Sequence, residues 1–517
     1  MGSLDAPRPL ITDAIAQHGH WQADKPALIC GERRISWRDF DRSTNQVAQG
    51  LRRLGLGPGS RIAVLMGNGV EMVELLFGAG KSAVTVVPLN TSVSDPAVAA
   101  MIADSGALAV AASGEHCRRI DALIAAGRLP AKLGRLGVDA PRDGWIDFAT
   151  WRDAAPAQPL SQGPEAATEC NIIYSSGTTG LPKGIVHSHG CRMHWAADLA
   201  IALRYHSGAV TLCSLGLYSN ISWVAMLATT LVGGTLVVMP VFSAAGMLEQ
   251  VERHGVTHGA FVPVQFQRLL ELPAPDPASV ASLRTIMCCG SPWPAAIKRA
   301  TRDRLGCELI ELYGLTEGIV TTLAPEDFDR KLESVGKPIP GQQLKLVGAD
   351  DCEAAPGECG EIVGYGRLVM DGYHNRPEAT LEATWTDGQG RRWLRTGDIG
   401  RLDDEGFLYI VDRKKDMILS GGQNIYPADI ESVMLEHPAV REVAVIGIPD
   451  PRWGETPLAV VVPRDGATLE PAALAAWTNE RVGRQQRISA AVLRAALPRN
   501  ANGKVLKREL RTEYVGA

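Results

Sequence analysis

The sequence predicts an α/β protein with a large N-terminal domain of parallel-rich sheets flanked by helices, a small β subdomain, and a small, mobile α+β C-terminal domain. Three observations predict this. The 517 residues exceed what one hydrophobic core organises. Hydrophobic residues make up 45% of the chain, as in ordinary globular proteins. Apolar strand-like and helix-like segments alternate, which is the pattern of parallel sheets with right-handed crossovers.

The N-terminal elements follow that alternation. The stretch "RISW" predicts a short strand, and apolar residues at helical spacing from Phe40 to Leu54 predict a helix that Gly55 ends. Next, "RIAVLM", "VEMVELLFGAG" and "AVTVVPLN" predict a strand, a helix and a strand.

Further along the chain, "HGAFVPV", "LRTIMCCG" and "CELIELYG" each predict a short strand that ends in small or turn-forming residues. Open α/β sheets bind ligands at such strand ends. Residues 205–248 contain no Asp, Glu, Lys or Arg, so a membrane span is one reading of this stretch. Gly233 and Gly234 divide it into a helix-like half and the β-branched "TLVVMP", which favours a buried helix and strand and predicts no membrane span.

The C-terminal part changes in texture. Short β-like segments over 344–363 predict a small β subdomain at about 340–411, and helix and strand patterns predict an α+β unit over the last hundred residues. We therefore predict a large domain over 1–411, a hinge over 412–416 and a small domain over 417–517.

Composition limits the partners and the compartment. The net charge of -5 argues against a general nucleic-acid surface. The ten cysteines form no C-x-x-C pair, which favours buried thiols in a reducing compartment. The N-terminal residues show no export signal, so we expect a cytoplasmic protein.

The stretch "IIYSSGTTGLPKGIVHSH", residues 172–189, predicts a polyphosphate-binding loop. Glycines let the backbone approach a ligand, hydroxyls and N–H groups donate to phosphate oxygens, and Lys183 adds positive charge. A plain turn would explain "SSG" but not so many donors with a lysine. The stretch is not a Walker motif, because Gly184 follows Lys183, so a magnesium ion must be held elsewhere.

Three further clusters supply what such a site lacks. In "ELYGLTEG", Tyr313 offers a flat face for a purine, Thr316 a hydroxyl and Glu317 a carboxylate for Mg²⁺. Asp398 and Arg413 can bind ribose hydroxyls, although this cluster taken alone favours two ordinary salt-bridge partners. Lys504, in the turn "NANGK", is either solvated or a source of charge for a transition state.

Together these clusters resemble the acyl-adenylate-forming superfamily of acyl-CoA synthetases, adenylation domains and luciferases. The matching stretches are "YSSGTTGLPKG", "YGLTE", "GYHNRPEAT", "RTGDIG", "DRKKDMILSGGQNIYP" and "NGK", in the order and approximate spacing of the family. The resemblance covers nearly the whole chain. It implies that a carboxylate attacks the α-phosphate of Mg-ATP to give an acyl-AMP and pyrophosphate, and that a thiol, most often coenzyme A, then takes the acyl group.

The resemblance also implies a role for each matching residue. The catalytic candidates are Lys504, Thr179 and Glu317, with Glu317 as the metal ligand. The phosphate loop is formed by Ser175, Ser176, Gly177, Thr178, Thr179, Gly180 and Lys183. The remaining nucleotide contacts are Gly290, Ser291, Pro292, Tyr313, Gly314, Thr316, Asp398 and Arg413. Lys415 is the hinge residue, and Gly421 and Gly422 line the path of the pantetheine arm.

The acyl pocket departs from the family pattern. In "LGLYSN", Gly216 stands where many acyl-CoA synthetases have proline and Ser219 where they have histidine. The usual aromatic gate therefore lacks its proline and its histidine here. The expected wall residues are Tyr218, Asn220, Trp223, Phe261 and Cys289, with buried core positions as the competing interpretation of the strand residues.

The first hypothesis is therefore a free-standing ligase that joins a carboxylic acid, preferably a fatty or aromatic monocarboxylate, to coenzyme A, with ATP, Mg²⁺ and coenzyme A as cosubstrates and cofactors. The alternative is an adenylation enzyme that loads a carrier protein in trans. A catalytically silent scaffold is disfavoured because Lys183, Glu317 and Lys504 are all present. The sequence leaves the acid and the oligomeric state open, with a homodimer as one option.

Overall fold

The fold is described from a computed structural model that covers residues 9–139, 142–175, 182–420, 423–484, 486–499 and 503–515. The chain divides into two compact units. The first comprises 1–332, 338–343 and 365–384, and the second comprises 333–337, 344–364 and 385–517. The expected hinge at 412–416 lies within the second unit, and the domain boundaries derived from the sequence stay a prediction.

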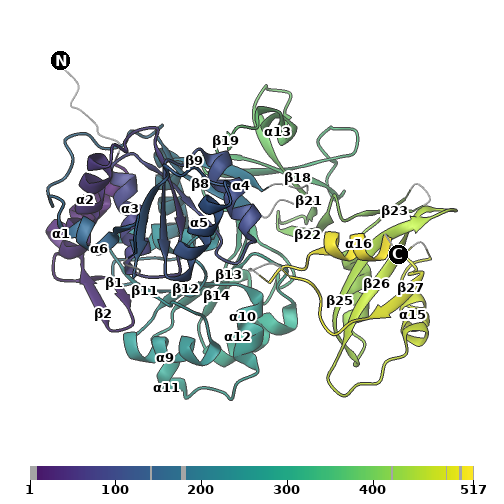
Figure 1. Cartoon of the computed structure of the whole chain (residues 1–517). Coiled ribbons are helices and arrows are strands. Elements are labelled where there is room, and N and C mark those ends of the chain that lie inside the picture. The colour runs from purple at the N-terminus through teal and green to yellow at the C-terminus, as the bar shows by residue number, and fades with distance from the viewer. Residues whose placement is uncertain are drawn as a thin grey trace. The chain divides into compact units, whose positions relative to one another are not determined.

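The first unit contains two mixed, largely parallel sheets (Figure 1). One has the order β16-β15-β14-β13-β12-β10-β11-β1-β2, and the other has the order β19-β9-β8-β4-β3-β5-β6-β7. Strands of the first sheet are β1 Pro26–Cys30, β2 Arg33–Ser36, β10 Val210–Cys213, β11 Thr235–Val238, β12 His258–Phe261, β13 Thr285–Cys289, β14 Glu308–Leu315, β15 Gly318–Leu323 and β16 Lys337–Pro338. Strands of the second are β3 Arg61–Leu65, β4 Thr85–Pro88, β5 Ala109–Ser113, β6 Gly134–Val138, β7 Ile146–Asp147, β8 Glu169–Ser175, β9 Lys183–Ser188 and β19 Gly372–Tyr373.

Helices cover these sheets, and a shared core joins the layers. The helices are α1 Ile11–Trp21, α2 Trp37–Arg53, α3 Val70–Lys81, α4 Asp95–Ser105, α5 Glu115–Ala125, α6 Phe148–Asp153, α7 His189–Ala202, α8 Asn220–Val232, α9 Ala244–His254, α10 Pro263–Leu270, α11 Pro277–Val280, α12 Ala295–Leu305 and α13 Pro377–Glu382, with a 3₁₀ turn at Pro325–Asp327. One buried cluster includes Val64 of β3, Trp195 of α7, Met226 of α8 and Met287 of β13. Both sheets therefore bury side chains in the same core.

The long apolar stretch folds as its two halves predict. Residues 220–232 form α8, Gly233 ends it in the left-handed conformation, and 235–238 form β11. Among the described residues, no helix is both long and apolar enough to cross a membrane. One strand is shorter than expected: "HGAFVPV" leaves the sheet after Phe261, because Pro263 begins α10.

The second unit contains a small β sheet and an α+β body. The small sheet has β17 Gln342–Val347, β18 Gly360–Gly366, β20 Thr384–Thr386, β21 Arg392–Leu402 and β22 Leu408–Arg413. The body has β23 Ile418–Ser420, β24 Gln423–Ile425, β25 Val440–Asp450, β26 Gly454–Pro463, β27 Ala490–Leu493, α14 Pro427–Leu435, α15 Pro471–Asn479 and α16 Lys507–Val515. Alternate residues of β25 and β26 pack under α14 and α15 on one face and under α16 on the other.

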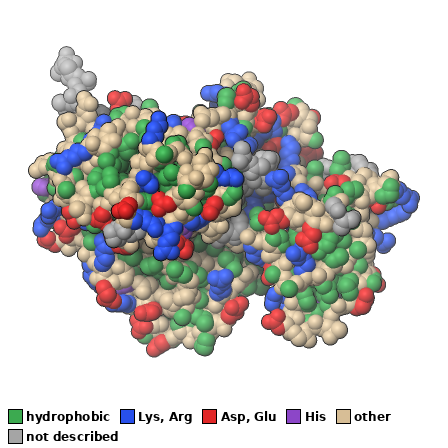
Figure 2. Space-filling model, in the orientation of Figure 1, with side chains coloured by type: hydrophobic (Ala, Val, Ile, Leu, Met, Phe, Trp, Pro, Cys, Tyr) green, Lys and Arg blue, Asp and Glu red, His purple; other side chains and the backbone are tan. Residues whose placement is uncertain are grey.

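Surface charge is mixed in sign. On the face shown in Figure 2, basic and acidic side chains are interspersed. The expectation that the chain binds no nucleic acid stays a prediction.

Candidate nucleotide and acyl site

The phosphate-loop segment lies at the tip of a β-hairpin. β8 and β9 pair antiparallel, with Ser175 opposite Lys183, so the chain leaves the hairpin and returns to it at these two residues. Ser176, Gly177, Thr178, Thr179 and Gly180 lie outside the described residues. Below the tip, a Cβ on Gly184 would approach Ile172 Cγ2 to 2.8 Å, so the hairpin packs tightly only with glycine there.

The carboxylate expected to bind Mg²⁺ sits in a tight turn. Leu315 at the end of β14 pairs with Gly318 at the start of β15, which leaves Thr316 and Glu317 as the two turn residues. Gly318 has a φ of 120°, and a Cβ there would lie 2.6 Å from Val369 Cα. The glycine therefore fixes the path of the turn, and with it the position of Glu317.

Tyr373 connects this turn to the phosphate-loop hairpin, and the sequence reasoning assigned it no role. The Lys183 ammonium lies 4.8 Å from the centre of the Tyr373 ring, and the Tyr373 hydroxyl donates a 2.9 Å hydrogen bond to Glu317 Oε1. Burial, and then the charge of Glu317, raise the pKa of Tyr373, so its phenol stays a donor. Lys183 and Glu317, predicted from distant segments, thus meet at one aromatic ring.

The ribose candidates form a cross-strand pair in the second unit. Asp398 of β21 is the register partner of Arg413 of β22, and Arg413 Nε lies 3.2 Å from Asp398 Oδ1. Asp398 is buried, whereas the Arg413 side chain is one-third exposed. The two are salt-bridge partners, as the competing interpretation held, and this pairing is compatible with ribose binding because a carboxylate accepts several hydrogen bonds.

Lys504 belongs to the same cluster of the second unit. Burial is the largest cause that lowers the pKa of Lys504 to about 7, and the charges of Arg413 and Lys415 lower it further. Asp398 and Asp416 oppose this lowering. Burial likewise lowers the pKa of Lys415 to about 8. The structure thus places the catalytic candidate beside the ribose pair and the expected hinge residue.

The lowered pKa predicts an unusually reactive amine. A lysine with a pKa near 7 loses its proton as the pH rises through 7, whereas an ordinary lysine keeps it to about pH 10. We expect acylation of Lys504 by an amine-selective reagent, followed by mass spectrometry of the free chain, to reach half its maximal rate near pH 7. A half-maximal rate near pH 10, as for an ordinary lysine, would contradict the assignment.

Asn220 and Trp223, expected as pocket walls, contact a buried arginine that the sequence reasoning missed. Arg192 of α7 is fully buried, donates to Asn220 Oδ1 at 2.9 Å and to Asn171 Oδ1 at 2.8 Å, and lies between two indole rings. Its Cζ is 5.1 Å from the ring centre of Trp223 and 5.4 Å from that of Trp195. Burial lowers the pKa of Arg192 to about 10. The arginine therefore braces the start of α8.

Replacing Arg192 with methionine should destabilise the fold. The amide oxygens of the buried Asn171 and the half-buried Asn220 would each lose a donor, which costs about 1–3 kcal/mol where the group is buried, and the relief of burying a charge offsets only part of this. We expect the free energy of unfolding, measured by urea denaturation, to fall by about 2 kcal/mol. The matched change of Arg253, an exposed partner of Glu32, should leave the free energy of unfolding nearly unchanged. Equal losses in both variants would refute the bracing role.

The strand ends nearest the expected acyl pocket meet the start of α8. Gly290, after β13, has a φ of 96°, and a Cβ there would lie 3.0 Å from Ile221 Cδ1 and 3.4 Å from Val262 Cγ1. Ile221 and Val262, which the sequence reasoning did not single out, therefore flank this turn. Ser291 is half-buried and Pro292 exposed in the same turn, while Tyr313 and Gly314 lie near the end of β14.

Phe261 and Cys289, two other expected wall residues, lie on opposite faces of the sheet. Phe261 packs on Phe266 of α10, whereas Cys289 joins the shared core on the opposite face of the sheet. The structure does not bring these two side chains to one face.

The two departures in "LGLYSN" have local structural causes. The half-buried Tyr218 lies over Gly216, where a Cβ would come within 2.2 Å of its ring, so this turn needs glycine. Ser219 caps α8 by accepting from the Ile221 N–H.

The donor set fits a Mg²⁺ ion that is held jointly with phosphate oxygens. Among the described residues, no group of three or more His, Cys, Asp or Glu side chains could hold a metal ion. Mg²⁺ ordinarily binds one or two carboxylates together with substrate phosphates and water, and the oriented Glu317 carboxylate meets that requirement. Gly421 and Gly422, expected along the pantetheine path, lie outside the described residues.

Two family models match the sequence. The model of the AMP-binding enzymes matches residues 15–374, and that of the AMP-binding enzyme C-terminal domain matches residues 429–504. The chain belongs to the AMP-binding enzyme family. A feruloyl-CoA synthase of Amycolatopsis sp. is 34% identical, with 94% of this chain and 96% of the relative covered.

Two further members resemble the chain over most of their length. The long-chain-fatty-acid–CoA ligase FadD13 of Mycobacterium tuberculosis is 35% identical, with 93% of each chain covered. The crystal structure of ATP-bound MatB from Rhodopseudomonas palustris superposes with a TM-score of 0.88 at 28% identity, covering 97% of this chain and 99% of MatB. These matches confirm the resemblance and the fold class predicted from the sequence.

Proposed function

We propose that this AMP-binding enzyme is an AMP-forming acid–CoA ligase. In the first step, a carboxylate oxygen attacks the α-phosphorus of ATP, the bond from that phosphorus to the bridging oxygen breaks, and pyrophosphate leaves. In the second, the thiol sulfur of coenzyme A attacks the acyl carbon, the bond to AMP breaks, and AMP leaves. Membership of the family and the CoA ligases among its relatives support both steps.

One observation carries the proposal: the link from Lys183 through Tyr373 to Glu317. It unites a cation for phosphate oxygens with a carboxylate for the accompanying metal. When bound there, Mg²⁺ would neutralise charge that develops on the phosphates. Lys183 would bind the β- and γ-phosphates, Thr316 the α-phosphate, and Tyr313 would stack on the adenine.

The second unit would supply the remaining groups. Asp398 would accept hydrogen bonds from the ribose hydroxyls, and Arg413 would orient that carboxylate. The Lys504 ammonium would bridge the attacking carboxylate and the α-phosphate.

We propose a fatty or aromatic monocarboxylate as the acid. The relatives named for ferulate and for long-chain fatty acids support this class. Arg192 does not suit a second carboxylate of the substrate, because its side chain is fully buried and already binds two amide oxygens. Loading of a carrier protein remains the less supported alternative, since both of these relatives are named for CoA.

Exchange of labelled pyrophosphate into ATP, driven by a panel of carboxylic acids, tests the first step. We expect exchange with fatty or aromatic acids and none without acid. Loss of free CoA thiol, compared with acylation of a phosphopantetheinylated carrier, then separates the two acceptors. No acid-dependent exchange across the panel would refute the proposed function.

A further inference from the structure

We propose that Tyr373 is a positioning residue of this site, whose hydroxyl orients the Glu317 carboxylate for the metal while its ring supports Lys183. The end of α4 would hold Tyr373 in place through its neighbour His374. The inference rests on the proposed function only in taking Glu317 as the metal carboxylate.

The backbone of Tyr373 is attached to the phosphate-loop hairpin on one side and to α13 on the other. As part of β19 it pairs with Ile185 of β9, two residues after Lys183. Its N–H donates to the Thr380 hydroxyl at 3.0 Å. Because the backbone is fixed at both partners, the half-buried side chain has little freedom to move away from Lys183 and Glu317.

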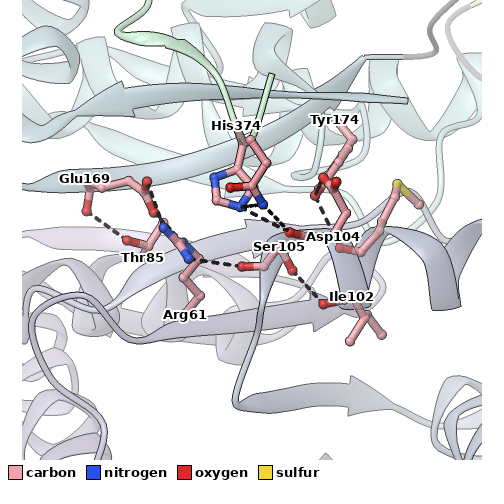
Figure 3. A network of polar contacts seen from close by, with 10 residues as sticks. Arg61, Thr85, Ile102, Asp104, Ser105, Glu169, Tyr174 and His374 are labelled. Carbon is pink, nitrogen blue, oxygen red and sulfur yellow. Dashed lines mark hydrogen bonds and ion pairs between the residues drawn. The ribbon is translucent and has the colours of Figure 1, made fainter. Parts of the chain in front are cut away.

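A polar network at the C-terminal end of α4 holds the flanks of the same hairpin (Figure 3). The Tyr174 hydroxyl, one residue before Ser175, donates to Asp104 Oδ2 at 2.6 Å. The Asp104 carbonyl lies 3.1 Å from His374 Nε2 and accepts from Asn375 Nδ2 at 3.2 Å. Carbonyls in the last turn of a helix have no partner within the helix, so this one is available to the segment that follows Tyr373.

Three more hydrogen bonds complete the network. The His374 backbone N–H donates to the Gly184 carbonyl at 2.8 Å. The residue after Tyr373 is thereby bonded to the residue after Lys183. Arg61 of β3 donates to Glu169 Oε1 at 2.7 Å and to the Ser105 carbonyl at 3.3 Å, and so ties the start of β8 to the same helix end (Figure 3). Tyr373 is therefore held by a frame that is independent of Glu317, which is what a positioning group requires.

This arrangement predicts a specific defect. Tyr373→Phe keeps the ring under Lys183 but removes the donor to Glu317, so the carboxylate loses its fixed orientation. ATP should still bind through the phosphate loop, but the increase in ATP affinity that Mg²⁺ gives should be smaller. Tyr409→Phe is the matched control, because it removes a tyrosine hydroxyl of the second unit that donates to Asp403 instead of Glu317.

The test is titration calorimetry of ATP, once with Mg²⁺ and once with a chelator, without acid or thiol. We expect Tyr373→Phe to reduce the ratio of the two affinities about tenfold and Tyr409→Phe to leave the ratio unchanged. In a Glu317→Gln background, Tyr373→Phe should change the ratio no further, because the two residues act through one contact. Thermal unfolding of each variant checks that the fold is kept.

An unchanged ratio in Tyr373→Phe, an equal change in Tyr409→Phe, or an additive effect with Glu317→Gln would overturn the inference. A wild-type chain whose ATP affinity does not depend on Mg²⁺ would overturn it as well. Because no acid is present, failure of acid-dependent pyrophosphate exchange would sink the proposed function without deciding this test.

Discussion

Replacing Lys504 with alanine is expected to abolish acyl-adenylate formation while leaving thioester formation from a presynthesised acyl-AMP largely intact. The ammonium group would stabilise negative charge only while the carboxylate and α-phosphate react. Loss of one such group costs about 10²–10³ in kcat at comparable sites. Acid-dependent pyrophosphate exchange measures the first step, and release of AMP from acyl-AMP in the presence of CoA measures the second.

The control for this prediction is Lys345→Ala. Lys345 is a partly exposed lysine of the same unit that pairs with Glu353 and lies outside the expected hinge, so its removal should affect neither step by more than about twofold. A Lys504→Ala chain that loses both steps equally would show that Lys504 does not serve adenylation alone.

The sequence predicted the regular elements where local pattern decides them. The division of 205–248 into α8 and β11 follows from Gly233, which ends α8 in the left-handed conformation that glycine adopts readily. Sequence reasoning extended "HGAFVPV" too far because it read apolar residues as strand, whereas Pro263 suits the first turn of a helix. Short apolar runs do not by themselves distinguish a strand from a helix start.

The site was predictable only as far as its motifs are contiguous. Lys183 and Glu317 stand in short, distinctive stretches, and both could be named from the sequence. Tyr373 could not be assigned a role, because its contacts join segments about 56 and 190 residues away. The stretch "GYHNRPEAT", which contains Tyr373, was the one signal in the sequence. It matched the family pattern but did not reveal which residues Tyr373 contacts.

Arg192 shows the opposite limit. Its sequence context is an ordinary helix of mixed composition, and only the folded chain reveals that α7, α8 and β8 enclose it. A buried cation of this kind carries no local pattern, because its neutral partners lie 21 and 28 residues away.

Glu317→Gln is the second change with a large expected effect. The amide keeps the shape of the side chain, and its oxygen can still accept from Tyr373, so the turn and the fold should persist. The negative charge that attracts Mg²⁺ is lost. We expect the Mg²⁺ concentration for half-maximal pyrophosphate exchange to rise at least tenfold and the maximal rate to fall about 10²-fold.

The matched control is Glu308→Gln, which changes a partly exposed carboxylate at the start of the same strand, β14, where it pairs with Arg204. That variant should keep the wild-type Mg²⁺ dependence, and its melting temperature should lie close to that of Glu317→Gln. Because both changes remove one negative charge from the first unit, a shift confined to Glu317→Gln assigns the effect to the position of the carboxylate. An unaltered Mg²⁺ dependence in Glu317→Gln would mean that the metal is held by other groups.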